Sequence, residues 1–112
     1  MDVKIVGDIR NGKFQPTLTG NPIVDDALID NFCKNLKSKI TAIHDVSVSV
    51  DHFFNPDAKE NSIIVIDDSI SKYLDNEVKK NNNLINVNHT DMLHGSVDNI
   101  VVKLADYLNK VV

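Results

Sequence analysis

The feature that most constrains the fold is a short continuous run of apolar side chains, Ile63-Ile64-Val65-Ile66. A strand that is apolar at every position is typical of the centre of a sheet whose two faces are both covered, although so short a run does not by itself exclude a helix. The run therefore predicts a central strand in a layered α/β structure.

The run ends abruptly in polar residues and begins an alternation of strands and helices. Asp67-Asp68-Ser69 follows it, an amphipathic helix is expected over residues 69–78, and a second strand is expected from Leu84 to Asn88. A final amphipathic helix is expected over residues 96–111. In open α/β sheets ligands favour the carboxyl ends of strands, so both strand ends are candidate sites.

The first half of the chain predicts a hairpin followed by a long helix. Asp2 to Ile9 alternates in part, and Asn11-Gly12 is typical of a two-residue hairpin turn. The returning strand, Lys13 to Leu18, contains a proline and is expected at a sheet edge. An asparagine cap before a proline then predicts a helix from Pro22 to Ile43, whose apolar residues recur on one face.

A strictly alternating segment, Asp45 to Asp51, predicts a strand with one apolar face. Its closeness to the central run predicts an antiparallel pair, with Asn55 to Asn61 as the connecting loop. The expected order is β-β-α-β-β-α-β-α, in an α/β fold with a mixed sheet of about five strands covered by three helices. Residues 1–112 are expected to form a single globular domain.

Composition and charge exclude several classes of protein. The 112 residues are 42% hydrophobic and 25% charged, with a formal net charge of −4. These values are typical of a soluble, folded protein, and the negative charge opposes binding to nucleic acid. The apolar runs are too short to cross a membrane, and we expect no membrane partner. The single Cys33 and the lack of a secretion signal predict an intracellular, cytoplasmic location.

Two groups of polar residues are candidates for chemistry. His89, Asp91 and His94 share one loop and could supply three ligands to a divalent ion, but their spacing is not diagnostic, so no metal or cofactor is assigned. Asp67 or Asp68 could bind magnesium, orient a histidine or act as a general base. Capping of the following helix by Ser69 or Asp68 is the favoured interpretation.

An acidic residue after one strand and a histidine after the next is similar to the closing part of α/β hydrolases, with Asp67 and His89 in those places. The chain contains no Gly-x-Ser-x-Gly nucleophile turn, so we treat the likeness as coincidence and assign no family. Gly7-Asp8 is interpreted as a turn and Cys33 as a packing residue. His52 has no partner at a recognisable spacing.

No catalytic constellation is complete, and the leading hypothesis is therefore a non-enzymatic protein-interaction or assembly module. Partner binding or self-association is expected through an edge strand of the opening hairpin or through Phe53-Phe54, where the two alternatives are that one ring is exposed or that both rings reach the core. The alternative is a small metal-assisted or acid/base hydrolase-like enzyme with its site near Asp67 and His89.

Overall fold

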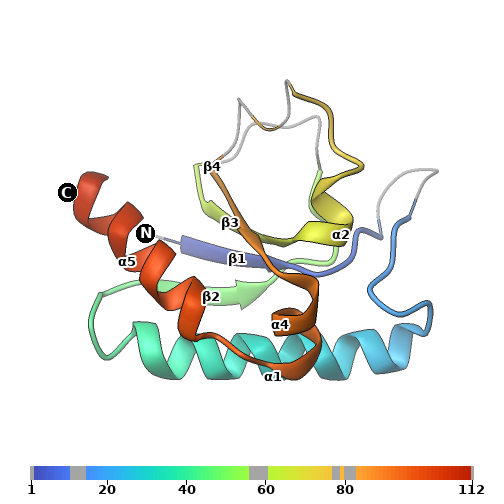
Figure 1. Ribbon diagram of the computed structural model, residues 1–112, viewed down its shortest axis with the longest axis horizontal. Coiled ribbons are helices and arrows are strands. Elements are labelled where there is room, and N and C mark those ends of the chain that lie inside the picture. The colour runs from blue at the N-terminus through green and yellow to red at the C-terminus, as the bar shows by residue number, and fades with distance from the viewer. Residues whose placement is uncertain (1, 11–14, 56–60, 77–78, 80–82, 112) are drawn as a thin grey trace.

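The computed structural model describes residues 2–10, 15–55, 61–76, 79 and 83–111. It contains a sheet of four strands in the order β2-β1-β3-β4, and every neighbouring pair is parallel (Figure 1). The strands are β1 (Asp2–Val6), β2 (Ser47–Val50), β3 (Ile63–Asp67) and β4 (Asn83–Val87). The predicted α/β class is confirmed, whereas the predicted mixed sheet is wrong.

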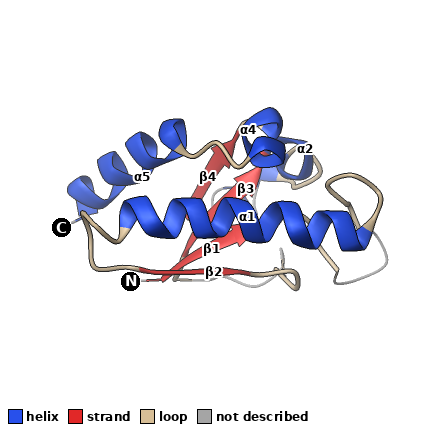
Figure 2. Ribbon diagram, turned by 90° about the horizontal axis from the view of Figure 1, so that it is seen from below, coloured by secondary structure: helices blue, strands red, loops and turns tan. Residues whose placement is uncertain are grey.

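Four helices within the described residues cover this sheet, and none of them is long and apolar enough to pass through a membrane. Figure 2 shows α1 in front of the sheet with α4 and α5 beside it. The apolar side chains of these three helices share one core with Val3, Ile5 and Val65. The helices are α1 (Pro22–Ile40), α2 (Asp68–Ser71), α4 (His89–His94) and α5 (Asp98–Val111).

The second face of the sheet has a smaller core of its own. Ile64 and Ile66 point to this face, where they pack with Ile70 of α2 and with Phe54. Because successive residues of a strand point to opposite faces, β3 contributes to both cores. All four residues from Ile63 to Ile66 are fully buried, which confirms the prediction of a central strand.

The predicted opening hairpin is wrong, although its proposed turn, Asn11-Gly12, lies outside the described residues. β1 is a central strand in which Val3 pairs with Val48 of β2 and with Ile63 of β3. Residues 15–18 form no strand. The chain instead continues into α1 and then returns as β2. This arrangement places β1 at the centre of the sheet, where apolar neighbours cover it on both sides.

The predicted antiparallel pair is also wrong, since β1 lies between β2 and β3 and all three are parallel. The connection from β2 to β3 is long enough for a crossover, which parallel strands require. Phe54 in this connection is fully buried in the second core. Burial of this ring holds the connection against the sheet face that α2 also covers.

The helices differ from the predictions mainly in their ends. Asn21 accepts from the backbone N–H groups of Ile23 and Val24 and so caps α1 as predicted, but the helix ends at Ile40. The loop expected around His89 is the short helix α4, which ends at His94 and is followed by the capping residue Gly95 with a φ of +67°. This left-handed conformation favours glycine and ends the helix.

The direction of the connections reverses between β1 and β3. The chain leaves β1 for β2 on one side, whereas it leaves β3 for β4 on the other. In open parallel sheets this reversal opens a crevice at the carboxyl ends of the two strands, where ligands bind. Asp8 follows β1 and Asp67 ends β3, so both carboxylates lie at this position.

Gly7 provides a test of the packing between β1 and α1. A Cβ atom at Gly7 would lie 2.6 Å from Cγ1 and 2.7 Å from Cδ1 of Ile29, which is fully buried. Gly7→Ala should therefore lower the free energy of unfolding by about 1–3 kcal/mol in urea denaturation. Ile29→Val removes one of the crowding atoms, so the double variant should lose less than the two single losses added together. Additive losses would show that the contact is not the cause.

Candidate functional site

A surface cleft of about 350 Å³ lies between the segment that precedes α1 and the segments that follow β3 and β4. Its first wall is the segment from Gln15 to Leu18, which leads from β1 to α1. Its second wall contains Ser69, Lys72 and Tyr73 at and after α2, together with His89 at the start of α4. Three parts of the fold therefore meet at this cleft: the segment before α1, the region of α2 and the start of α4.

Asp67 and His89 form a direct pair beside the cleft. Nδ1 of His89 lies 3.0 Å from Oδ2 and 3.1 Å from Oδ1 of Asp67. The sheet register causes this contact, because Asp67 pairs with Val87, two residues before the histidine. Asp67 is fully buried, whereas the His89 side chain is 39% exposed. The prediction of polar groups gathered at a parallel strand pair therefore holds for these two residues.

Asp67 also caps α2. Its Oδ2 atom accepts from the backbone N–H of Ser69 at 3.0 Å and from the Ser69 hydroxyl. The predicted cap, Ser69 or Asp68, is therefore wrong, because the carboxylate of Asp67 both caps α2 and contacts the histidine. The Ser69 hydroxyl is engaged by Asp67, so it is not held by His89 as a nucleophile would be. Asp68 is exposed in the first turn of α2.

The predicted metal ligands His89, Asp91 and His94 are not brought together. All three lie on α4, where Asp91 accepts from Asn99 at 3.3 Å and borders a different cleft. His94 is the last residue of the helix. Positions two apart on a helix point in nearly opposite directions, which separates His89 from Asp91.

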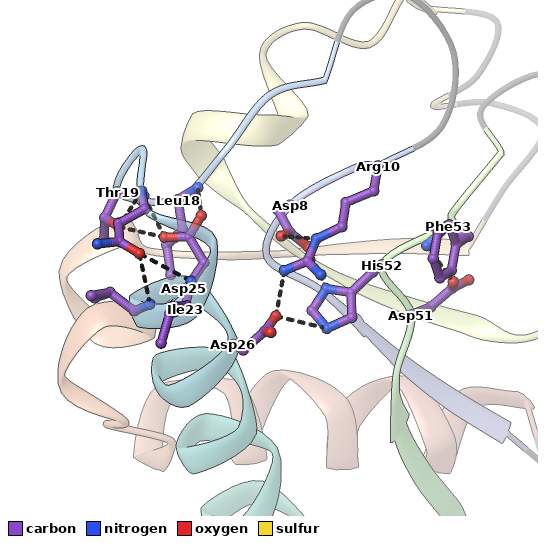
Figure 3. A network of polar contacts seen from close by, with 12 residues as sticks. Asp8, Arg10, Leu18, Thr19, Ile23, Asp25, Asp26, Asp51, His52 and Phe53 are labelled. Carbon is purple, nitrogen blue, oxygen red and sulfur yellow. Dashed lines mark hydrogen bonds and ion pairs between the residues drawn. The ribbon is translucent and has the colours of Figure 1, made fainter.

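Asp8, Arg10, Asp26 and His52 form a second cluster (Figure 3), and a neighbouring cleft bordered by Asp8 and Arg10 shares Gln15 and Thr17 with the cleft at His89. Asp8 is 2% exposed, and its carboxylate contacts Nδ1 of His52 at 2.6 Å and accepts from Nε of Arg10 at 3.0 Å. Asp26 accepts from the Arg10 guanidinium and lies 3.4 Å from Nε2 of His52. Two carboxylates thus share two basic side chains.

Oxygen and nitrogen atoms of Asp8, Asp26 and His52 lie within 4.8 Å of one another, a spacing that suits a metal ion. Arg10 already supplies a positive charge to both carboxylates. Desolvation lowers the pKa of Arg10. Hydrogen bonds and charge attraction from Asp26 and Asp8 together raise this pKa by more than desolvation lowers it, so it lies above the ordinary value. The guanidinium therefore remains charged and contacts both carboxylates.

Sequence analysis missed this second cluster. Asp8 follows a parallel strand just as Asp67 does, and the same rule for strand ends would have selected it. The hairpin prediction concealed it, because a hairpin would have reversed the chain directly after Asp8. His52 lacked a partner for the same reason, since its partner lies far away in the sequence and meets it only in the parallel pairing of β1 with β2.

A third buried carboxylate, Asp25, fixes the first wall of the cleft. It is fully buried and accepts from the backbone N–H groups of Leu18 at 3.2 Å and Thr19 at 2.8 Å (Figure 3). It also accepts from the Thr19 hydroxyl. The segment before α1 is therefore held by the first turn of that helix.

The two adjacent phenylalanines after β2 have opposite environments. Phe54 is fully buried, whereas the neighbouring Phe53 is 67% exposed. Of the two arrangements considered from the sequence, this is the one in which a single ring remains accessible.

Asp25→Ala should detach the wall of the cleft. The change leaves two backbone donors and a hydroxyl without their acceptor, and we expect the free energy of unfolding to fall by about 1–3 kcal/mol. Asp30→Ala on an exposed position of the same helix is the control and should change stability by less than about 0.5 kcal/mol. Equal losses in urea denaturation of the two variants would contradict this role.

Cys33 is partly buried in α1, and burial raises the pKa of its thiol, with a further rise from the charge of Asp30. A raised pKa leaves less thiolate at a given pH, and the thiolate is the reactive form. Alkylation by iodoacetamide at pH 7.5 should therefore be at least about tenfold slower in the folded protein than in urea. Equal rates, followed by mass spectrometry, would show that the thiol is neither shielded nor shifted.

Comparisons with protein-family models, curated proteins and solved structures found no match. The functional argument for this chain therefore depends on the geometry of its own residues.

Proposed function

We propose that this protein is a small acid/base enzyme in which His89 transfers a proton to or from a molecule bound in the cleft beside it. The observation that carries the proposal is the contact between Nδ1 of His89 and the fully buried carboxylate of Asp67. A histidine oriented in this way is the usual arrangement of a general base.

The chemistry follows from the two ring nitrogens. With Nδ1–H donating to Asp67, the lone pair of Nε2 is available, and no partner for Nε2 exists among the residues that the structure describes. Nε2 can then accept a proton from a water molecule as that water attacks a substrate. The buried carboxylate stabilises the positive charge that the ring acquires.

Hydrolysis is the reaction class that this proposal favours. Ser69 is engaged by Asp67, so the nucleophile in the proposed reaction is water rather than a side chain. After the attack, the protonated Nε2 can return its proton to the leaving group. One histidine then serves first as base and next as acid.

Protein interaction is the second candidate, and the exposure of Phe53 favours it. The ring is 67% exposed and follows β2, which is an edge strand of the sheet. An edge strand can pair with a second chain, and an exposed aromatic ring can anchor it. A route through an opening hairpin no longer applies, because β1 is central.

The acid/base proposal can be tested with a panel of chromogenic phosphate, carboxylate-ester and amide substrates. His89→Gln should lower kcat/KM for the substrate that is turned over by about 10²–10⁴-fold, as loss of a general base does. Asp67→Asn should lower it by at least about tenfold, because the amide can hold the ring in the wrong tautomer. His94→Gln, on the same helix, is the matched control and should keep the wild-type rate.

Two results would overturn this function. One is the absence of turnover for every substrate class in the panel, and the other is an unchanged rate in His89→Gln. Circular dichroism and thermal unfolding of each variant identify losses that come from unfolding. A dimer in light scattering that Phe53→Ser converts to a monomer would favour the second candidate instead.

A further inference from the structure

We infer that the cleft beside His89 takes small molecules that carry a compact oxyanion group, such as a phosphate or a carboxylate. The inference rests on the proposed function in that it names the substrate class of the same site. It is based on the charges that border the cleft, which differ from those that border three other clefts of the described chain.

The wall of this cleft contains no carboxylate among the residues that the structure describes, although the whole chain has a net charge of −4. Three other clefts of the described chain each have at least one aspartate in the wall. These are Asp91 in the first, Asp98 in the second, and Asp8 and Asp25 in the third. An anion entering those clefts would meet repulsion at close range. The cleft at His89 lacks that repulsion.

Lys72 supplies the positive charge. Its Nζ atom lies 5.3 Å from the centre of the Tyr73 ring, and no carboxylate pairs with it within the described part of the chain. Lys39, by contrast, pairs with Asp98. The ring supports the ammonium group without neutralising it, so its charge remains available to a ligand.

His89 borders the same cleft as Lys72. Asp67 lies behind the ring, where it is fully buried and engaged by donors, and it does not border the cleft. Nδ1 of His89 is occupied by Asp67, which leaves Nε2 as the ring nitrogen available to a substrate in the cleft that Lys72 also borders. An anionic group would thus place its substrate between Lys72 and the nitrogen that transfers the proton.

The experiment is a titration of ¹⁵N-labelled protein with inorganic phosphate, with acetate and with neutral glycerol, at constant ionic strength. Phosphate or acetate should shift the amide signals of Thr17, Ser69, Lys72 and His89, and glycerol should not. Lys72→Met should weaken binding of the anion by about five- to tenfold, the effect of losing one charged contact. Lys110→Met removes the same charge from an exposed position near the end of α5 and should leave the affinity unchanged.

The two anions separate the two forms of the inference, since preference for phosphate indicates a phosphate-bearing substrate and preference for acetate a carboxylate-bearing one. Binding of neither anion at these residues, or equal affinity in Lys72→Met and wild type, would overturn it. The proposed function fails separately. Anion binding that depends on Lys72, together with an unchanged rate in His89→Gln, would retain the ligand class and reject the catalytic role.

Discussion

Parallel pairing of β1 with β2 and β3, and of β3 with β4, brings the carboxyl ends of all four strands to one edge of the sheet. The rest of the site depends on this pairing. His52 after β2 meets Asp8 after β1, and His89 after β4 meets Asp67 at the end of β3. Each contact joins residues that are far apart in the sequence but adjacent at the edge.

Buried aspartates are the second recurring element of this edge. Asp8, Asp25 and Asp67 are at most 2% exposed, and each accepts hydrogen bonds or contacts a histidine. Burying a carboxylate is costly unless donors surround it, so each of these residues orders the groups around it. Asp25 orders one wall of the cleft and Asp67 orders the other, which leaves the space between them bordered by Lys72 and His89.

Part of this arrangement could be predicted from local patterns. The apolar run of β3, the capped helix α1 and the strand β4 were all located correctly, because burial and capping each require particular residue types. Asp67 and His89 were selected because each follows such a strand. The Asn11-Gly12 pair and the short stretch of sequence between β2 and β3 led to wrong strand pairings. Local turn preference does not determine which strands lie next to each other in the sheet.

The sequence by itself determined the α/β class, the buried central strand and the presence of polar side chains at two strand ends, because periodicity and residue type fix which segments are buried. Only the tertiary structure decided the strand order β2-β1-β3-β4 and the meeting of Asp8, Arg10, Asp26 and His52. Strand order depends on the summed packing of both sheet faces. The summed packing depends on contacts between distant segments, so strand order does not follow from the residues of any single segment.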